Sequence, residues 1–257
     1  MYIDVHCHLD DSTYGDLSAL VNSCESEGVT RLIAVGFDIP SSRFALSCAE
    51  KYQSVYFAAG FHPTELSKYK EGDLDIIADL CSHPKCVALG EIGLDYHYPD
   101  TDKQKQKEIF LRQLDLAQKL SMPVQIHSRD CAEDMYALLK ANAEKLKSGA
   151  LLHCYSHSSE MAVEFAKLNL YFSFGGASTW KGSKKAKRTI AALPVDRLLT
   201  ETDSPYMPPQ SAYGSFPNTP RSIPEITACM AAEKGVRVDQ MAQTVWENAH
   251  ALFKKLG

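Results

Sequence analysis

The sequence lacks the features that mark membrane, secreted and repetitive proteins. Its 257 residues contain no apolar run long enough to cross a bilayer and no leader of the signal-peptide kind, so we expect neither feature. The eight cysteines form no CxxC pair and no regular framework, which predicts reduced thiols and a cytoplasmic protein. No repeat, low-complexity tract or linker divides the chain, and we therefore expect one domain over residues 1–257.

Charge of one sign is also scarce, because 27 Lys and Arg residues nearly balance 32 Asp and Glu residues, for a net charge of −5. Such a protein does not attract nucleic acid as a whole, so a phosphate-bearing substrate would need a local positive patch or bound metal ions. The one dense basic run is WKGSKKAKR at residues 180–188. A solvated helix surface is its more common explanation. The alternative is an electrostatic guide for a polyanion, with Trp180 as a stacking surface for a base.

Eight short apolar runs recur along the chain, and segments with helical spacing separate them. None of the runs alternates cleanly between apolar and polar residues, which favours strands buried on both faces of a parallel sheet. Eight strands in about 250 residues predict an α/β protein with a single (β/α)8 TIM barrel. A doubly wound sheet is the rival fold, but it usually has fewer strands and no reason to place a polar residue after nearly every one. The runs are 3–5, 32–35, 55–60, 87–89, 124–126, 150–152, 170–174 and 198–199.

Histidines and carboxylates follow these runs, at the strand ends where barrel enzymes carry out their chemistry. His6 and His8 are separated by one residue within a strand, so their side chains project to the same side. A lone buried histidine is usually a satisfied core residue, but a core could not satisfy six such side chains without partners. We therefore expect a metal site at the C-terminal ends of the strands, formed by His6, His8, Glu91, His127, His153 and Asp203.

Four imidazoles and two carboxylates exceed the needs of one tetrahedral ion and suit two divalent metals that share a carboxylate. Glu91 comes from a middle strand and is the predicted bridge. Asp203 would bind one metal and orient or deprotonate a water. By ligand type the imidazoles suit Zn, Mn or Fe better than Mg, and the identity of the two divalent ions (Mg, Mn or Zn) stays open.

Further polar residues on the same face are candidates for substrate binding. The planar guanidinium of Arg129 suits a phosphate, with a structural salt bridge as the alternative. His62 could contact a phosphate or donate to a leaving group, or have a structural role. Glu201 could support a metal ligand or Arg129, and Asp95 could cap a helix or orient a ligand. The segment 205–224 is rich in Pro and Ser and is expected to form a long loop on the catalytic face.

Six blocks of the sequence, taken together, resemble the TatD family of metal-dependent deoxyribonucleases, a branch of the amidohydrolase-like barrels. The blocks are DVHCHL (4–9), GFHP (60–63), GEIGLDY (90–96), PVQIHSR (123–129), HCYS (153–156) and ETDSP (201–205). The resemblance runs in order through essentially the whole chain. It implies a TIM barrel that hydrolyses phosphodiester bonds in DNA as a 3′–5′ exonuclease, with the six metal ligands named above and with His62 and Arg129 on the substrate side.

The chain departs from this family pattern in two places. The family commonly has glycine after the serine of the HCYS block, where this chain has His157, a residue that either crowds the site or adds a polar contact. The stretch 210–215 of the long final loop is also distinctive, and it bears on the choice of substrate.

These observations predict a two-metal phosphodiesterase that acts on DNA, either single strands or 3′ ends, as a monomer without a membrane partner. Asp203 would steer the attacking water, while Arg129 and His62 neutralise charge in the transition state. One alternative is a hydrolase of small esters, amides or lactones on the same barrel. Many two-metal enzymes of that wider group carry a bridging carboxylated lysine where this chain has Glu91. Another alternative is a non-catalytic, metal-bound DNA-binding scaffold, against which the complete ligand set speaks.

Overall fold

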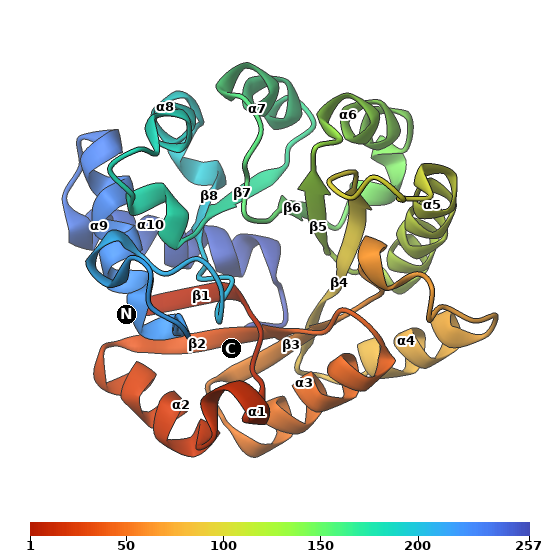
Figure 1. Cartoon of the computed structure of the whole chain (residues 1–257), viewed down its shortest axis with the longest axis horizontal. Helices are drawn as coiled ribbons and strands as arrows, with labels where there is room; N and C mark the ends of the chain where they lie inside the picture. Colours follow the sequence, from red (N-terminus) through yellow and green to blue (C-terminus); the bar gives the residue numbers. More distant parts are fainter.

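Each strand of a single parallel sheet pairs with the next strand along the chain, from β1 to β8 (Figure 1). The computed structural model describes residues 1–257, and its strands curve into a barrel with helices outside, as the sequence predicts. The strands are β1 (Tyr2–Cys7), β2 (Val29–Val35), β3 (Val55–Ala59), β4 (Cys86–Asp95), β5 (Val124–Arg129), β6 (Ala150–Leu152), β7 (Tyr171–Phe174) and β8 (Leu198–Thr200).

Several helices begin where a short polar side chain satisfies a free backbone N–H group. Asp38 accepts a hydrogen bond from the backbone N–H of Ser41 at the start of α3, and Asp102 does the same for Lys105 in α5. No helix combines the length and hydrophobicity that a membrane crossing needs. The helices are α1 (Asp11–Tyr14), α2 (Leu17–Ser26), α3 (Ile39–Lys51), α4 (Asp73–Cys81), α5 (Lys103–Leu120), α6 (Ala132–Ala141), α7 (Ser159–Ala166), α8 (Lys184–Ala192), α9 (Ile223–Lys234) and α10 (Val238–Leu252).

Strand β4 is longer than its apolar run indicates, since it continues through Asp95 and contains Glu91. Its pairing with β5 shifts register between Leu89 and Ile92. Gly93 has a φ of 148°, and a Cβ there would lie 2.0 Å from the backbone oxygen of His127. The expected end of this strand at residue 89 was therefore wrong, because a glycine allows the close approach that continues the pairing.

Strands β8 and β1 close the barrel without a regular ladder between them. Thr200 Oγ1 donates to the backbone oxygen of Ile3 at 2.9 Å, and the backbone N–H of Thr202 donates to Asp4 Oδ1 at 3.0 Å. Just beyond the strand, the N–H of Asp203 donates to the backbone oxygen of His6 at 3.0 Å. Single side-chain and backbone hydrogen bonds thus seal the one seam that strand pairing leaves open.

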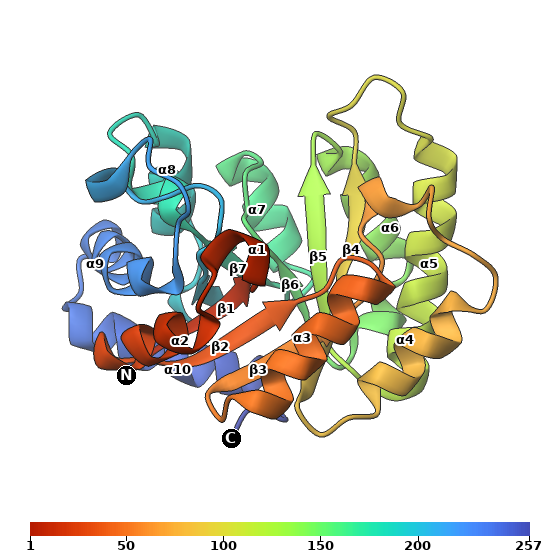
Figure 2. The same ribbon diagram turned by 60° about the horizontal axis from the view of Figure 1, so that its bottom comes forward.

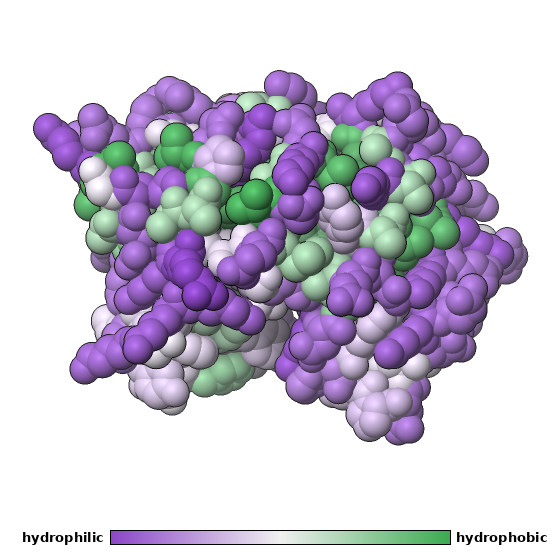
Figure 3. Space-filling model, turned by 90° about the horizontal axis from the view of Figure 1, so that it is seen from above, coloured by the Kyte–Doolittle hydropathy of each residue, from purple (hydrophilic) through white to green (hydrophobic).

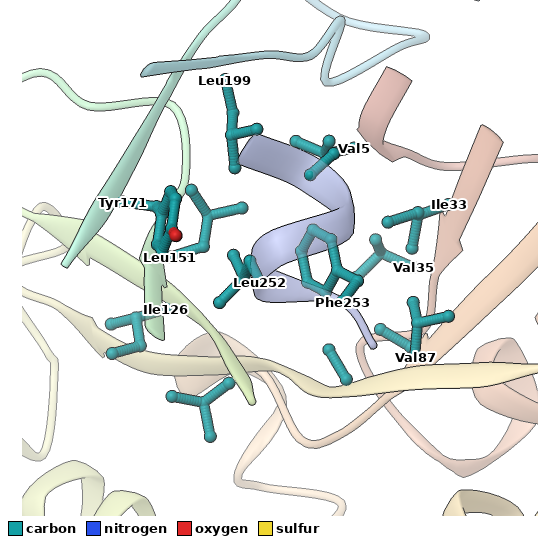
Figure 4. Packing of buried hydrophobic residues seen from close by; sticks show 14 of the residues in the cluster. Val5, Ile33, Val35, Val87, Ile126, Leu151, Tyr171, Leu199, Leu252 and Phe253 are labelled. Carbon is teal, nitrogen blue, oxygen red and sulfur yellow. The ribbon is translucent and has the colours of Figure 1, made fainter. Parts of the chain in front are cut away.

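The end of α10 fills the core on the side where the strands begin. Figure 4 shows Leu252 and Phe253 among apolar side chains from β1, β2, β4, β5, β6 and β8. The last residue, Gly257, accepts a hydrogen bond from Arg31 near the start of β2. The outer face that carries α6, α7 and α8 is mostly hydrophilic, with separate apolar patches (Figure 3). Apolar packing therefore occupies one end of the barrel and leaves the other end for polar groups.

Candidate metal centre

All six predicted ligands lie together at the C-terminal end of the barrel, toward which the arrowheads of β4 and β5 point in Figure 2. Three of them lie within β1, β4 and β5, two directly follow β1 and β6, and Asp203 lies three residues beyond the end of β8. The strands bring them together from positions that are up to 197 residues apart, since parallel strands end on one face. The set is His6, His8, Glu91, His127, His153 and Asp203.

Glu91 lies at the centre of the cluster, and its two carboxylate oxygens face different histidines. Glu91 Oε2 is 3.5 Å from His6 Nε2 and 3.8 Å from His8 Nε2. Glu91 Oε1 is 2.9 Å from His127 Nδ1 and 2.7 Å from His153 Nε2. This arrangement is the one that a carboxylate shared between two ions requires.

Asp203 belongs to one side of this cluster. Its Oδ1 atom is 3.3 Å from His8 Nε2 and 3.8 Å from His6 Nε2. Two ligand groups result, one formed by His6, His8 and Asp203 and the other by His127 and His153, with Glu91 between them.

His6 provides the clearest test of whether these residues fit a metal. The side chain is fully buried, and its Nε2 atom has no hydrogen-bond partner. Its Nδ1 atom lies 2.7 Å from Gln125 Oε1, which fixes the ring so that Nε2 points at the carboxylates of Glu91 and Asp203. A buried imidazole nitrogen without a partner is costly unless something binds it. The donor set of four imidazoles and two carboxylates fits divalent metal ions.

Two more contacts orient His8 and His127. His8 Nδ1 lies 3.0 Å from the backbone oxygen of Val35. Asp95 Oδ2 lies 2.9 Å from His127 Nε2, which decides between the two expectations for Asp95 in favour of orienting a ligand. Such outer contacts fix the tautomer and direction of a ligating ring.

Glu201 lies beside a histidine and makes no ion pair with Arg129. It is fully buried and lies 3.7 Å from His153 Nδ1, and its Oε2 atom accepts a hydrogen bond from Ser173 Oγ at 2.6 Å. Gln125 and Ser173 are the residues of this outer layer that sequence reasoning missed. Both lie inside apolar strand runs, where nothing local marks them as partners of a distant side chain.

The electrostatics of the cluster keep its carboxylates ionised. Burial acts to raise the pKa of Glu91, but His153, His62 and His127 outweigh it and hold the pKa well below its usual value. For Asp203, the hydrogen bond from His8 and the neighbouring imidazoles likewise outweigh burial and lower the pKa. Two ionised carboxylates among imidazoles form a site prepared for cations.

A cleft of about 670 Å³ opens onto the metal cluster. His62 lines it, with Nε2 3.3 Å from Glu91 Oε1, and burial lowers the pKa of this imidazole. Arg129 is exposed at the end of β5, outside the cleft lining, and makes no ion pair. His157 also lies outside the lining, where its Nε2 atom is 2.7 Å from Ser128 Oγ. It therefore adds a polar contact and does not crowd the cleft.

The sequence pattern of the TatD related DNase family matches residues 3–254. The chain belongs to the TatD family. It is 38% identical to the uncharacterized metal-dependent hydrolase YabD of Bacillus subtilis, over 99% of both chains. It is 31% identical to the 3′-5′ ssDNA/RNA exonuclease TatD of Klebsiella pneumoniae, over 97% of both. The crystal structure of YjjV, a TatD homologue from Escherichia coli, superposes with a TM-score of 0.93 at 32% identity, over 98% of both chains.

Membership in the TatD family makes this chain a metal-dependent hydrolase and confirms the resemblance seen in its sequence blocks. The histidine and carboxylate groups described above provide several places where three or more ligand atoms lie within 4.8 Å of one another. These groups are the places where this TatD-family barrel can bind metal.

Proposed function

We propose that residues 1–257 form one hydrolase unit that cleaves phosphodiester bonds in single-stranded DNA from the 3′ end with two divalent metal ions. The observation that carries the proposal is the position of Glu91, whose two oxygens face two separate histidine groups at 2.7–3.8 Å. The name of the Klebsiella pneumoniae relative, a 3′-5′ ssDNA/RNA exonuclease, supports the substrate and the direction.

The residues present divide into two sets of metal ligands. His6, His8 and Asp203 would hold one ion, and His127 and His153 would hold the other, with Glu91 shared. Bound Mg, Mn or Zn supplies Lewis acidity, which neutralises phosphate charge and makes a water nucleophilic at neutral pH.

Asp203 and His62 perform the proton and hydrogen-bond steps that the chain itself supplies. The lowered pKa of Asp203 keeps this carboxylate ionised at neutral pH, so it can orient the attacking water and accept its proton. His62 Nδ1 lies 2.7 Å from Thr64 Oγ1, which fixes the ring with Nε2 in the cleft. Its lowered pKa keeps the imidazole neutral, so it can donate a hydrogen bond to a phosphate oxygen.

Arg129 acts farther from the reacting bond. Because it is exposed and makes no ion pair, its guanidinium is free to bind a phosphate next to the one being cleaved.

The test uses metal-stripped protein, to which Mg, Mn or Zn is added separately with single-stranded DNA labelled at its 5′ end. The expected product is a metal-dependent ladder that shortens from the 3′ end. It disappears in Asp203→Asn and persists in Asp196→Asn, a matched change at an exposed aspartate.

A protein that binds two metals but cleaves no DNA would refute this proposal. Turnover of small esters, amides or lactones would then assign the site to that hydrolase class. Tight DNA binding without turnover would instead indicate a scaffold.

A further inference from the structure

The densest basic run of the sequence lies outside the lining of the metal cleft. It is formed by Lys181, Lys184, Lys185, Lys187 and Arg188, which we call the α8 patch. None of these side chains forms an ion pair with a carboxylate, whereas Lys107, Lys147 and Lys167 each do. In a protein with a net charge of −5, five neighbouring cations without anionic partners are available for a ligand.

The positive charges of the α8 patch do not stabilise helix α8. The patch occupies the loop before α8 and the first turns of α8, where positive side chains oppose the helix dipole. Ser183, the residue before the helix, gives its hydroxyl to the backbone oxygen of Ala177 and caps no N–H group of α8. Helix formation therefore does not explain these charges, and an anion bound beside them would offset their repulsion.

Aromatic side chains lie next to the patch. The ring of Trp180 meets that of Tyr213 edge to face, with centroids 5.3 Å apart, and Tyr213 is 65% exposed. Trp180 Nε1 donates to the backbone oxygen of Pro208 at 2.8 Å, which fixes the indole against the loop after β8. Cations beside exposed aromatic rings form the combination that binds single-stranded nucleic acid through phosphates and stacked bases.

The loop after β8 connects this surface to the metal cleft. Tyr206 lines the cleft, with its ring centroid 6.5 Å from that of His8. Pro208, which contacts Trp180, is two residues farther along, and two residues span at most about 7 Å. Figure 2 shows α8 and this loop at the end of the barrel toward which β4 and β5 point. A strand that leaves the metal centre over Tyr206 therefore reaches the α8 patch directly.

The opposite side of the cleft has the reverse character. Its lining contains Asp38 and Glu65 and no Lys or Arg, and the nearby Lys68 is ion-paired with both carboxylates. The lining also contains the apolar rings of Phe37 and Phe44. Such a surface repels further phosphates but accepts a sugar and a base, so it suits the terminal nucleoside of a chain.

We propose that this charge asymmetry positions the substrate, with the terminal nucleoside in the cleft beside Phe37 and the rest of a single-stranded polynucleotide on the α8 patch and Tyr213. The proposal rests on the proposed nuclease function. It states that the α8 patch binds the part of the polynucleotide that lies beyond the reacting bond, away from the terminal nucleoside. It also explains why cleavage would proceed from an end, since the acidic side has no place for a continuing phosphate backbone.

The experiment compares Lys181→Gln/Lys184→Gln/Lys185→Gln with Lys51→Gln/Lys119→Gln/Lys140→Gln. The second triple removes the same charge from exposed lysines without carboxylate partners, at the helix ends on the other face of the barrel. Binding of a phosphorothioate single strand of about 20 nucleotides, which resists cleavage, is followed by fluorescence anisotropy between 50 and 200 mM salt. Hydrolysis of a dinucleotide, which has no chain to reach the patch, is measured in parallel.

We expect the first triple to bind the strand more weakly. The slope of log affinity against log salt should become shallower by about 2, because each of the three lost phosphate contacts contributes about 0.7. The ratio of the first triple's dissociation constant to that of the wild type then shrinks roughly 18-fold between 50 and 200 mM salt. Its dinucleotide hydrolysis is unchanged, and the second triple matches the wild type. Tyr213→Ala weakens strand binding roughly 5- to 100-fold without changing the salt slope, because stacking is uncharged.

The proposal would be overturned if the two triple variants bound the strand with the same affinity and salt slope. It would also be overturned if the first triple lost dinucleotide hydrolysis as much as strand binding. Failure of the nuclease function is distinguishable from these results. A wild type that hydrolyses neither substrate refutes the nuclease, while the anisotropy data still support the patch if only the first triple and Tyr213→Ala lose affinity.

Discussion

Replacing Gln125 tests whether the layer behind the histidines sets the metal affinity of one side of the centre. Gln125 is fully buried, its Oε1 atom lies 2.7 Å from His6 Nδ1, and its Nε2 atom donates to the backbone oxygen of Val5 at 3.0 Å. Gln125→Leu keeps the volume but removes both contacts. The ring of His6 can then turn, and Nε2 is no longer held toward Glu91 and Asp203.

The expected loss in metal affinity is 10- to 100-fold, the usual effect of removing a hydrogen-bond partner behind a ligand, which is about 1.4–2.7 kcal/mol. Only the site that contains His6 should be affected. Two buried polar groups are also left unpaired, at about 1–3 kcal/mol each, so the melting temperature should fall by roughly 5–20 °C.

Calorimetric titration of metal-stripped protein, with a competing chelator, separates the two dissociation constants. The matched control is Gln113→Leu, which removes a buried glutamine that bonds both the N–H and the C=O of Phe61, at 2.8 and 3.0 Å, and touches no metal-site histidine. It should lose stability and keep both affinities. The reasoning is wrong if Gln125→Leu leaves both affinities intact, or if the control weakens them equally.

Two further predictions concern stability. Chelation should lower the melting temperature by roughly 10–20 °C and re-addition of metal should restore it, since two ions at 100 times their dissociation constants contribute about 5 kcal/mol; an unchanged thermal scan would contradict this. Burial acts to raise the pKa of Asp38, but hydrogen bonds from Ser41 and the charge of Lys68 outweigh it and lower the pKa. The ionised carboxylate therefore stabilises the fold above the ordinary pKa of 3.8, and this contribution is lost as the pH falls through the lower pKa of the folded state. The difference in unfolding free energy between wild type and Asp38→Asn should therefore be constant above about pH 5 and shrink below pH 4; a difference that grows in acid would reverse the argument.

The sequence predicts those parts of this protein that local patterns encode. The strand at residues 150–152 was predicted with both ends correct, because three apolar residues follow a glycine and precede a histidine. The candidate ligands stand out for a similar reason, since His6 and His153 directly follow apolar runs and Asp203 lies four residues after one. The topology of a barrel then brings such residues together without further information.

Contacts between distant residues cannot be predicted from local sequence patterns. Gln125 and His6 are 119 residues apart, and only the finished barrel shows that they are partners. The end of β4 was missed because Gly90 and Glu91 look like the start of a loop, whereas the close approach of Gly93 to His127 continues the strand. The proximity of Glu201 to His153 and its hydrogen bond from Ser173 are likewise tertiary properties.

The closure of the barrel and the geometry of the metal centre depend on the same short segment. Because β8 and β1 share no ladder, their spacing is set by Asp4, which binds both the N–H and the hydroxyl of Thr202, and by the bond from the N–H of Asp203 to His6. The next bond, from the N–H of His8 to the backbone oxygen of Ser204 at 2.8 Å, holds the other side of the same seam. The contacts that close the barrel therefore also fix Asp203 against the two histidines of β1.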